Sequence, residues 1–309
     1  MRISDDDIRA AYKMFLGRTA SDEEVERMSK NVKDLASLRE IFFDSPEFQS
    51  QIGLNRRNSG ENPEAVVHIH VPKTAGTSLN EILRRDHDQD AVLQIAIHQM
   101  DQLLSKDQKA RRQVKVLMGH LQYGAARHLP QNSVYLAVLR EPGPRIFSFY
   151  RFIMRSVTHP MHQEMKAAET TFGGFLRRTL DKPGLRLEID NGQTRRLAGQ
   201  MLVPRVDYRA MFATAIRNIA MPDMIVGTTE RFEALLYTLH ARGLIKSADN
   251  RFDNVDSGTA RFDAALEELD AVERSLLESY CYWDRLLHEA ASLLVDGTQC
   301  DIPSATDVA

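Results

Sequence analysis

Short apolar runs alternate with amphipathic helical patterns through most of this 309-residue chain. The apolar runs cover residues 65–71, 114–119, 134–139 and 224–228, and the helical patterns cover 77–85, 98–112, 143–156 and 209–218. Such alternation predicts an α/β fold with a parallel sheet flanked by helices, because neighbouring parallel strands need a crossover that is usually helical. A further helical stretch is expected over 261–295.

A small all-α domain is expected before this sheet. Residues 1–52 contain three short helical patterns, and the polar segment GLNRRNSGENPE follows them. Gly, Asn and Pro in that segment are typical of a linker. We therefore expect a helical module at 1–52, a linker at 53–64, an α/β domain at 65–296 and a loose tail at 297–309.

Composition argues against several classes of function. The formal net charge of −3 gives no support for nucleic-acid binding. No run of apolar residues is long enough for a membrane span, and the acidic N-terminus does not resemble a signal peptide. Only two cysteines are present, Cys281 and Cys300, so neither a disulfide framework nor a cysteine metal cluster is indicated. A cytoplasmic protein is the expectation.

The stretch AVVHIHVPKTAGTSLNEIL, residues 65–83, changes from a strand pattern to a tight loop and then to a helix start. We call residues 72–78 the phosphate loop, because a helix N-terminus after a strand presents backbone N–H groups to an anion. Gly76 allows close approach of the backbone, Lys73 supplies a charge, and hydroxyls follow at Thr77 and Ser78.

The phosphate loop is not a Walker A loop. That motif places its lysine directly before Ser or Thr, whereas Lys73 precedes Gly76 by three residues. The later strands also end without a convincing Mg²⁺-binding aspartate. ATP with Mg²⁺ is therefore a poor fit to this loop.

A second strand-to-helix element lies in VYLAVLREPGPRIFSFYRF, residues 134–152. Arg140 is expected at the carboxyl end of the strand, and Ser148 lies eight residues later in the helix. An arginine and a serine that converge in this way suit a second phosphate. Arg145 is a further candidate cation.

Together, PKTAGTS and LREPGPRIFSFY resemble the two nucleotide-binding elements of sulfotransferases, most closely the carbohydrate branch that includes the heparan sulfate 2-O-sulfotransferases and bacterial relatives. The resemblance covers about residues 65–290. It implies 3′-phosphoadenosine-5′-phosphosulfate as donor, adenosine 3′,5′-bisphosphate as product, and no metal. The implied phosphosulfate ligands are Lys73, Thr74, Ala75, Gly76, Thr77 and Ser78, and the implied 3′-phosphate ligands are Arg140 and Ser148. Lys73 would also stabilise the leaving oxygen.

Histidine is the usual base near neutral pH, and His120 follows the strand over 114–119, where α/β sites lie. A Gly-His pair at this point also resembles the base position of the 2-O-sulfotransferases. His120 is therefore the expected general base, with His128 or Glu141 as the alternatives. His68 and His70 lie in or beside the first strand and are expected to pack.

The segment DNGQTRRLAGQ, residues 190–200, resembles an N-x-Q-T-R-x-L-[AS]-G segment of the same family. Asn191, Gln193 and Arg195 are candidates for contact with acceptor hydroxyls or with an anionic group. A capped helix with a solvated Arg pair is the competing interpretation. The basic pairs at 177–178 and 195–196 either favour an anionic acceptor or are plain surface.

The N-terminal helices resemble a small bacterial module marked by Y-x-x-x-L-G-R and S-P-E-F. Its role does not follow from the sequence, and Arg18 and Glu47 are expected to pin its helices together.

The sequence thus predicts an enzyme that moves a sulfuryl group to a hydroxyl of a carbohydrate or glycolipid acceptor. The alternatives are a P-loop kinase or NTPase that uses ATP and Mg²⁺, and a non-catalytic module that binds nucleotide or glycan. The acceptor, the hydroxyl position, the residues around adenine and the oligomeric state are not determined by the sequence.

Overall fold

The computed structural model describes residues 3–16, 18–32, 34, 37–38, 41–42, 45, 47, 63–249 and 259–299. Most of the expected linker at 53–64 and the last ten residues of the expected tail lie outside this part of the chain. Within it, every helix is too short or too polar to cross a lipid bilayer.

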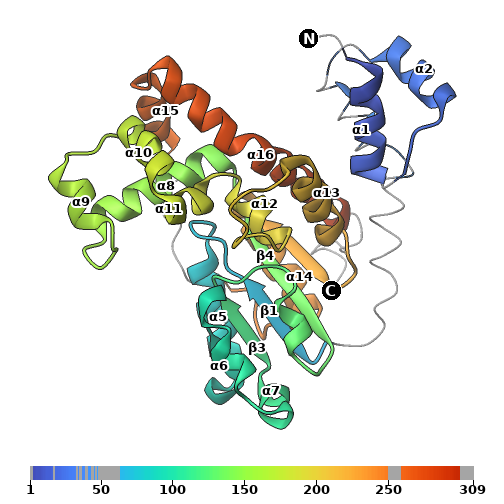
Figure 1. Ribbon diagram of the computed structural model, residues 1–309. Coiled ribbons are helices and arrows are strands. Elements are labelled where there is room, and N and C mark those ends of the chain that lie inside the picture. The colour runs from blue at the N-terminus through green and yellow to red at the C-terminus, as the bar shows by residue number, and fades with distance from the viewer. Residues whose placement is uncertain are drawn as a thin grey trace, which may run out of the picture.

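The centre of the molecule is one sheet of five parallel strands in the order β2-β3-β1-β4-β5 (Figure 1). The strands are β1 (Ala65–Ile69), β2 (Val92–Gln94), β3 (Val116–Gly119), β4 (Ser133–Leu139) and β5 (Met224–Thr228). The predicted P-loop-like α/β fold is confirmed. Only β2 was missed, because three half-buried or exposed residues at the sheet edge give almost no apolar pattern.

Both faces of the sheet are buried, as expected for parallel strands. Alternate residues such as Val67, Leu117 and Ala137 join an apolar cluster with α13 (Tyr208–Ile219) and α16 (Ala271–Gln299). The intervening residues, such as Val66 and Leu136, pack against α5 (Gly76–Asp86) and α14 (Phe232–Ala241). Figure 1 shows these helices on opposite sides of the strands.

A third apolar cluster is made mainly of helices beyond the carboxyl ends of the strands. Its helices are α8 (Pro142–Arg155), α9 (His162–Ala167), α10 (Phe172–Arg178), α11 (Pro183–Ile189) and α15 (Thr259–Glu267), together with the first half of α16. The short α12 (Gly192–Leu197) links this cluster to the sheet.

Two predicted helices differ in detail. The stretch 98–112 is broken into a 3-10 turn (Ile97–Gln99), α6 (Asp101–Leu104) and α7 (Gln108–Gln113). The break has a local cause, since Asp107 accepts a bond from the Ala110 N–H at 2.7 Å and so starts a new helix. The C-terminal stretch is two helices, and α16 runs to Gln299, beyond the expected domain boundary at 296.

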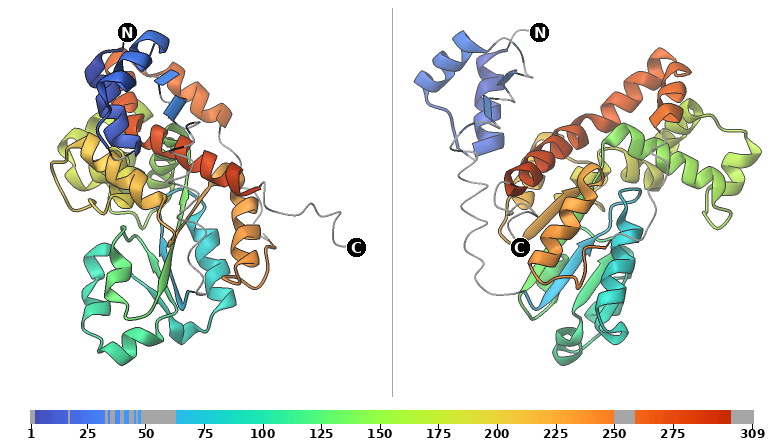
Figure 2. Two further views of the ribbon diagram at one scale, coloured as in Figure 1. Left: turned by 90° about the vertical axis from the view of Figure 1, so that its right-hand side faces the viewer. Right: turned by 180° about the vertical axis from the view of Figure 1, so that it is seen from behind.

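The N-terminal helix α1 (Asp5–Leu16) contacts both α2 (Asp22–Asn31) and α13 (Figure 2). The Phe15 ring packs edge-on against Phe212 of α13, with ring centroids 6.3 Å apart. Arg18 donates to both Glu24 and Glu47, at 2.6–2.9 Å, so it does hold the module together as predicted. The other residues of the L-G-R and S-P-E-F motifs are only partly among those described.

Candidate functional site

The carboxyl ends of β1, β3 and β4 meet at one edge of the sheet. Ile69 of β1 is in register with Gly119 of β3 and with Ala137 of β4, so the loops after all three strands leave together. These loops carry Lys73, His120 and Arg140, the three residues that the sequence analysis weighted most. Ligands of open α/β sheets bind at this edge.

The phosphate loop turns sharply before α5. Lys73 and Ala75 have φ values of 71° and 60°, in the left-handed region that L-residues adopt only when neighbouring structure holds them there. Thr74 is fully buried, and its hydroxyl donates to the Val71 carbonyl at 2.9 Å, which braces the turn. Thr74 is thus a support of the loop, whereas Thr77 is exposed.

Helix α5 begins at Gly76 without a side-chain cap and without an acidic residue in its first turn. The first N–H groups of a helix have no partner inside it, so those at the start of α5 can bind an anion. Ala75, Thr77 and Ser78 frame this position.

Gly76 has a steric reason to be glycine. A Cβ at this position would lie 2.1 Å from Cδ2 and 2.4 Å from Nε2 of His70. The imidazole of His70 therefore lies directly against the first residue of α5. The sequence pointed to Gly76 for anion approach but gave no sign of this contact.

Arg140 joins the two predicted phosphate elements. Its guanidinium donates to the Lys73 carbonyl at 3.3 Å, while its backbone N–H and C=O bond to the Gln193 amide at 3.0 and 2.8 Å. Burial lowers the pKa of Arg140, although the group stays charged at any ordinary pH. The phosphate loop and the strand-to-helix element that contains Arg140 are therefore side by side.

One face of α8 lies against the phosphate loop. The Lys73 ammonium lies 4.7 Å from the centroid of the Phe152 ring, and Ser148 and Arg155 share that face at helical spacing. Burial lowers the pKa of Lys73, and the charges of Arg155 and Arg140 lower it further. Three cations at this edge, with Ser148 half-buried on the same helix face, favour a ligand with several negative charges.

His120 directly follows β3 and is exposed. Its Nδ1 is 3.1 Å from the His70 carbonyl oxygen and must donate to it, so Nε2 is left as the basic nitrogen. Desolvation of the ring, followed by the charge of Arg196, lowers the pKa of His120 below its usual value. The imidazole is therefore neutral and ready to accept a proton near pH 7.

The predicted packing histidines form a polar chain instead of an apolar contact. His68 Nδ1 is 2.7 Å from Asn80 Oδ1, and Asn80 Nδ2 is 3.2 Å from His70 Nδ1. His68 is fully buried, so packing describes it correctly, but half-buried His70 reaches the site. The available signal was the two-residue spacing of the histidines on one strand face, with Asn80 on the next helix.

The predicted acceptor ligands are placed in the interior. Asn191, Gln193 and Arg195 are 0–2% exposed. Asn191 bonds the backbone of α16, and Arg195 donates to the Asp190 and Val203 carbonyls. In this structure all three bond neighbouring backbone, and their assignment as acceptor ligands stays a prediction.

The two basic pairs are also neutralised by the protein. Arg177 pairs with Asp270 and Glu273, and Arg178 donates to Glu164. Arg196 is 1% exposed and makes two bonds to Glu188, at 2.6 and 2.7 Å. Burial alone would raise the pKa of Glu188, but Arg196 outweighs it and lowers the pKa. The pairs thus give no support for an anionic acceptor.

The alternative residues lie away from the three strand ends or point elsewhere. Arg145 is fully buried and pairs with Asp284 at 3.5 Å, so it is not a phosphate cation. The His128 carbonyl contacts Arg111 of α7, near the amino end of β3. Burial raises the pKa of Glu141, whose Oε2 lies close to Gly143 in the first turn of α8. Of the three candidate bases, His120 is the exposed one, directly after β3.

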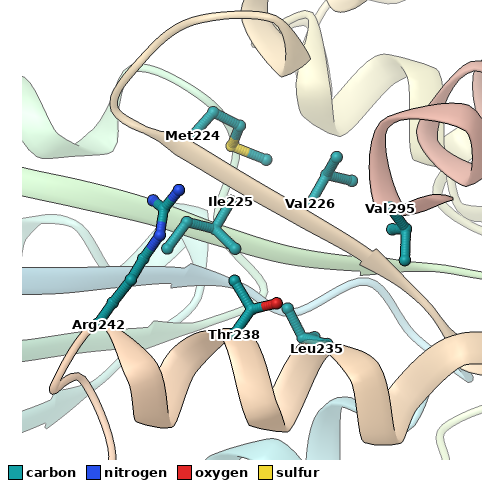
Figure 3. A pocket seen from close by; sticks show the side chains of 7 residues that line it. All are labelled: Met224, Ile225, Val226, Leu235, Thr238, Arg242 and Val295. Carbon is teal, nitrogen blue, oxygen red and sulfur yellow. The ribbon is translucent and has the colours of Figure 1, made fainter. Parts of the chain in front are cut away.

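A small hollow lies elsewhere, along the edge strand β5 between α14 and the end of α16 (Figure 3). It is lined by Met224, Ile225, Val226, Leu235, Thr238, Arg242 and Val295. With mostly apolar walls and one cation, it does not suit a polyphosphate. Across the described ranges, no three His, Cys, Asp or Glu side chains are grouped as a metal site requires.

Comparison with known proteins agrees with this arrangement. The chain matches no curated protein. The five-stranded parallel sheet with a phosphate loop after β1 is consistent with the P-loop-like fold of sulfotransferases. Residues 61–206, which include the phosphate loop, His120, Arg140 and Ser148, match the family model described as "Sulfotransferase family", and this match supports a sulfotransferase domain in that part of the chain.

Proposed function

We propose that the chain transfers a sulfuryl group from 3′-phosphoadenosine-5′-phosphosulfate to a hydroxyl of a carbohydrate or glycan-containing acceptor. The observation that carries the proposal is the bond from the Arg140 guanidinium to the Lys73 carbonyl, at 3.3 Å. It joins one anion-binding element at the start of α5 to a second at the start of α8. A donor with two separate phosphate groups needs two such elements.

The residues present fit this donor. The uncapped start of α5, together with Lys73, would hold the 5′-phosphosulfate, and Arg140 with Ser148 would hold the 3′-phosphate. In the transfer, the acceptor oxygen forms a bond to sulfur while the bond from sulfur to the phosphate oxygen breaks. His120 Nε2 takes the acceptor proton, and Lys73 stabilises the charge that develops on the leaving oxygen.

Lys73 must move only its side chain to do this. Its ammonium rests over the Phe152 ring, which is a weak site compared with a phosphate oxygen. The carbohydrate nature of the acceptor rests on the resemblance of the two motifs to carbohydrate sulfotransferases. Positioning then supplies much of the rate, because both reactants are held at one edge of the sheet.

Calorimetry of the full chain tests the donor. Adenosine 3′,5′-bisphosphate should bind with the same affinity in the presence and absence of EDTA. Equal or tighter binding of ATP with Mg²⁺ would instead favour a kinase or NTPase. A screen of glycan acceptors with sulfur-labelled donor then tests transfer, and bisphosphate binding without any transfer would favour a non-catalytic module.

A further inference from the structure

We propose that His70 is a second histidine of the transfer site: it donates a hydrogen bond from Nε2 to the anion held at the start of α5, and Asn80 keeps the proton on that nitrogen. This inference rests on the proposed function, because it concerns the same site. It gives a catalytic contact to a residue that the sequence assigned to packing.

The tautomer of His70 follows from the bonds of Asn80. The Asn80 amide oxygen faces His68 Nδ1 at 2.7 Å, and its amide nitrogen faces His70 Nδ1 at 3.2 Å. An amide nitrogen only donates, so His70 Nδ1 accepts and the ring hydrogen lies on Nε2. Asn80 is thus a positioning residue, and His70 Nε2 is a donor.

The position of this donor follows from Gly76. Nε2 of His70 is 2.4 Å from the point where a Gly76 Cβ would stand, so the N–H lies beside the first turn of α5. The backbone N–H groups of that turn, which has no side-chain cap, belong to the same end of α5. An anion bound there meets the imidazole as well as the helix.

His70 also contacts the proposed base. The two rings have centroids 4.9 Å apart, and the His70 carbonyl accepts the hydrogen bond from His120 Nδ1 at 3.1 Å. Its backbone therefore orients His120 while its side chain lies between His120 and the phosphate loop. The transferred group has to pass between those two elements.

The His70 imidazole, which donates this hydrogen bond, is neutral. Burial and the adjacent rings of His68 and His120 lower the pKa of His70 to about 3, and the charges of Arg196 and Lys73 act in the same direction. Protonation would disrupt the acceptor role of Nδ1 toward Asn80. A neutral imidazole can stabilise oxygen charge that grows during transfer, and it keeps its own proton throughout.

Nitrogen NMR of histidine-labelled full chain tests the tautomer. We expect the Nε2–H form of His70 in the wild type and the Nδ1–H form in Asn80→Asp, because a carboxylate accepts where the amide donated. Asn31→Asp, on an exposed position of α2, is the control. An Nδ1–H form of His70 in the wild type would overturn the proposal.

The same spectra test the contact. Addition of adenosine 3′,5′-bisphosphate should shift the His70 Nε2 signal. A response to inorganic sulfate when the bisphosphate does not bind would keep His70 as an anion donor and would contradict the nucleotide assignment instead. No response to either ion would overturn the inference for His70.

Kinetics separate a donor from a structural residue. His70→Leu should weaken bisphosphate binding and lower kcat, each by about 10- to 100-fold, the effect of losing one strong hydrogen bond to an anion. His70→Gln keeps an N–H donor and should retain most of the rate. His240→Gln on α14 is the matched control. Equal losses in the leucine and glutamine variants would assign His70 to packing alone, as would a leucine variant with wild-type kcat.

Discussion

Two helices of this protein begin in the same way and have opposite fates. Both α5 and α12 follow a non-glycine residue in the left-handed conformation, Ala75 with φ 60° and Asn191 with φ 52°, and neither has a side-chain cap. In α12 the N–H groups of Gln193 and Thr194 donate to the buried carboxylate of Asp284, at 3.2 and 2.7 Å. Neither helix has an acid in its own first turn, but within the described residues no carboxylate bonds the start of α5, which lies at the carboxyl edge of the sheet.

The protein therefore supplies its own anion to one helix start and leaves the other for a ligand. Both stretches look like binding motifs in the sequence, because both are polar and rich in small residues. This difference between the two helix starts predicts which property a substitution changes first. Substitutions around α12 should reduce stability first, and substitutions around α5 should reduce binding or turnover while the fold is kept.

The largest expected effect comes from Asp284→Ala. This substitution leaves the fully buried Arg145 without its partner and frees the N–H groups of α12, so the free energy of unfolding should fall by about 3–5 kcal/mol. Urea denaturation measures the loss, and exposed Asp181→Ala is the control. A loss no greater than that of the control would remove the contrast between the two helix starts.

His120→Ala should lower kcat by about 10²–10⁴-fold, the usual contribution of a general base, with little change in unfolding or in bisphosphate affinity. Because the pKa of His120 is lowered, the acid-side fall of the wild-type rate, where Nε2 becomes protonated, should be centred below the ordinary histidine pKa. A pH profile of kcat checks both points. His128→Ala is the control. If His128→Ala lost most of its kcat while His120→Ala kept the wild-type value, the general base would be His128 and not His120.

Arg140→Ala should weaken binding of adenosine 3′,5′-bisphosphate by about 1.5–3 kcal/mol, the value of a charged hydrogen bond. The backbone bonds of residue 140 to Gln193 do not need the side chain, so the unfolding free energy should change little. Calorimetry beside Arg178→Ala, a surface arginine, measures the difference. Unchanged affinity would show that the second phosphate element is misplaced.

The smallest effect is expected for Thr194→Val. The Thr194 hydroxyl donates to Asp284 at 2.8 Å, and its loss should cost about 1 kcal/mol of unfolding free energy. Bisphosphate affinity should not change. Thr214→Val is the control, because that hydroxyl bonds only within its own helix, α13. Weaker bisphosphate binding at unchanged stability would mean that α12 takes part in the site after all.

Local pattern was enough to place much of this site before the fold was known. Apolar runs predicted four of the five strands. Since parallel strands end at a common edge, Lys73, His120 and Arg140 could be expected together. The phosphate loop was also recognisable, because a strand, a tight turn and a helix start are adjacent in the chain.

Burial of polar residues could not be predicted in the same way. The segment at 190–200 suggested either contacts with an acceptor or a capped helix with a solvated Arg pair. Only the packing of α16 brings Asp284 to it from about ninety residues away. Arg145 is buried for the same reason, although its position in the motif suggested a phosphate ligand.

By itself, the sequence determined which candidate residues directly follow which strand, and therefore which of them lie at the carboxyl edge of the sheet. Only the tertiary structure decided which polar groups keep their hydrogen-bonding capacity for a ligand. His70 is the clearest case, because its donor nitrogen is defined by Asn80 on one side and by the absent Cβ of Gly76 on the other. The physical reason is that a polar group is available only when folding has not already given it a partner, and partners come from distant parts of the chain.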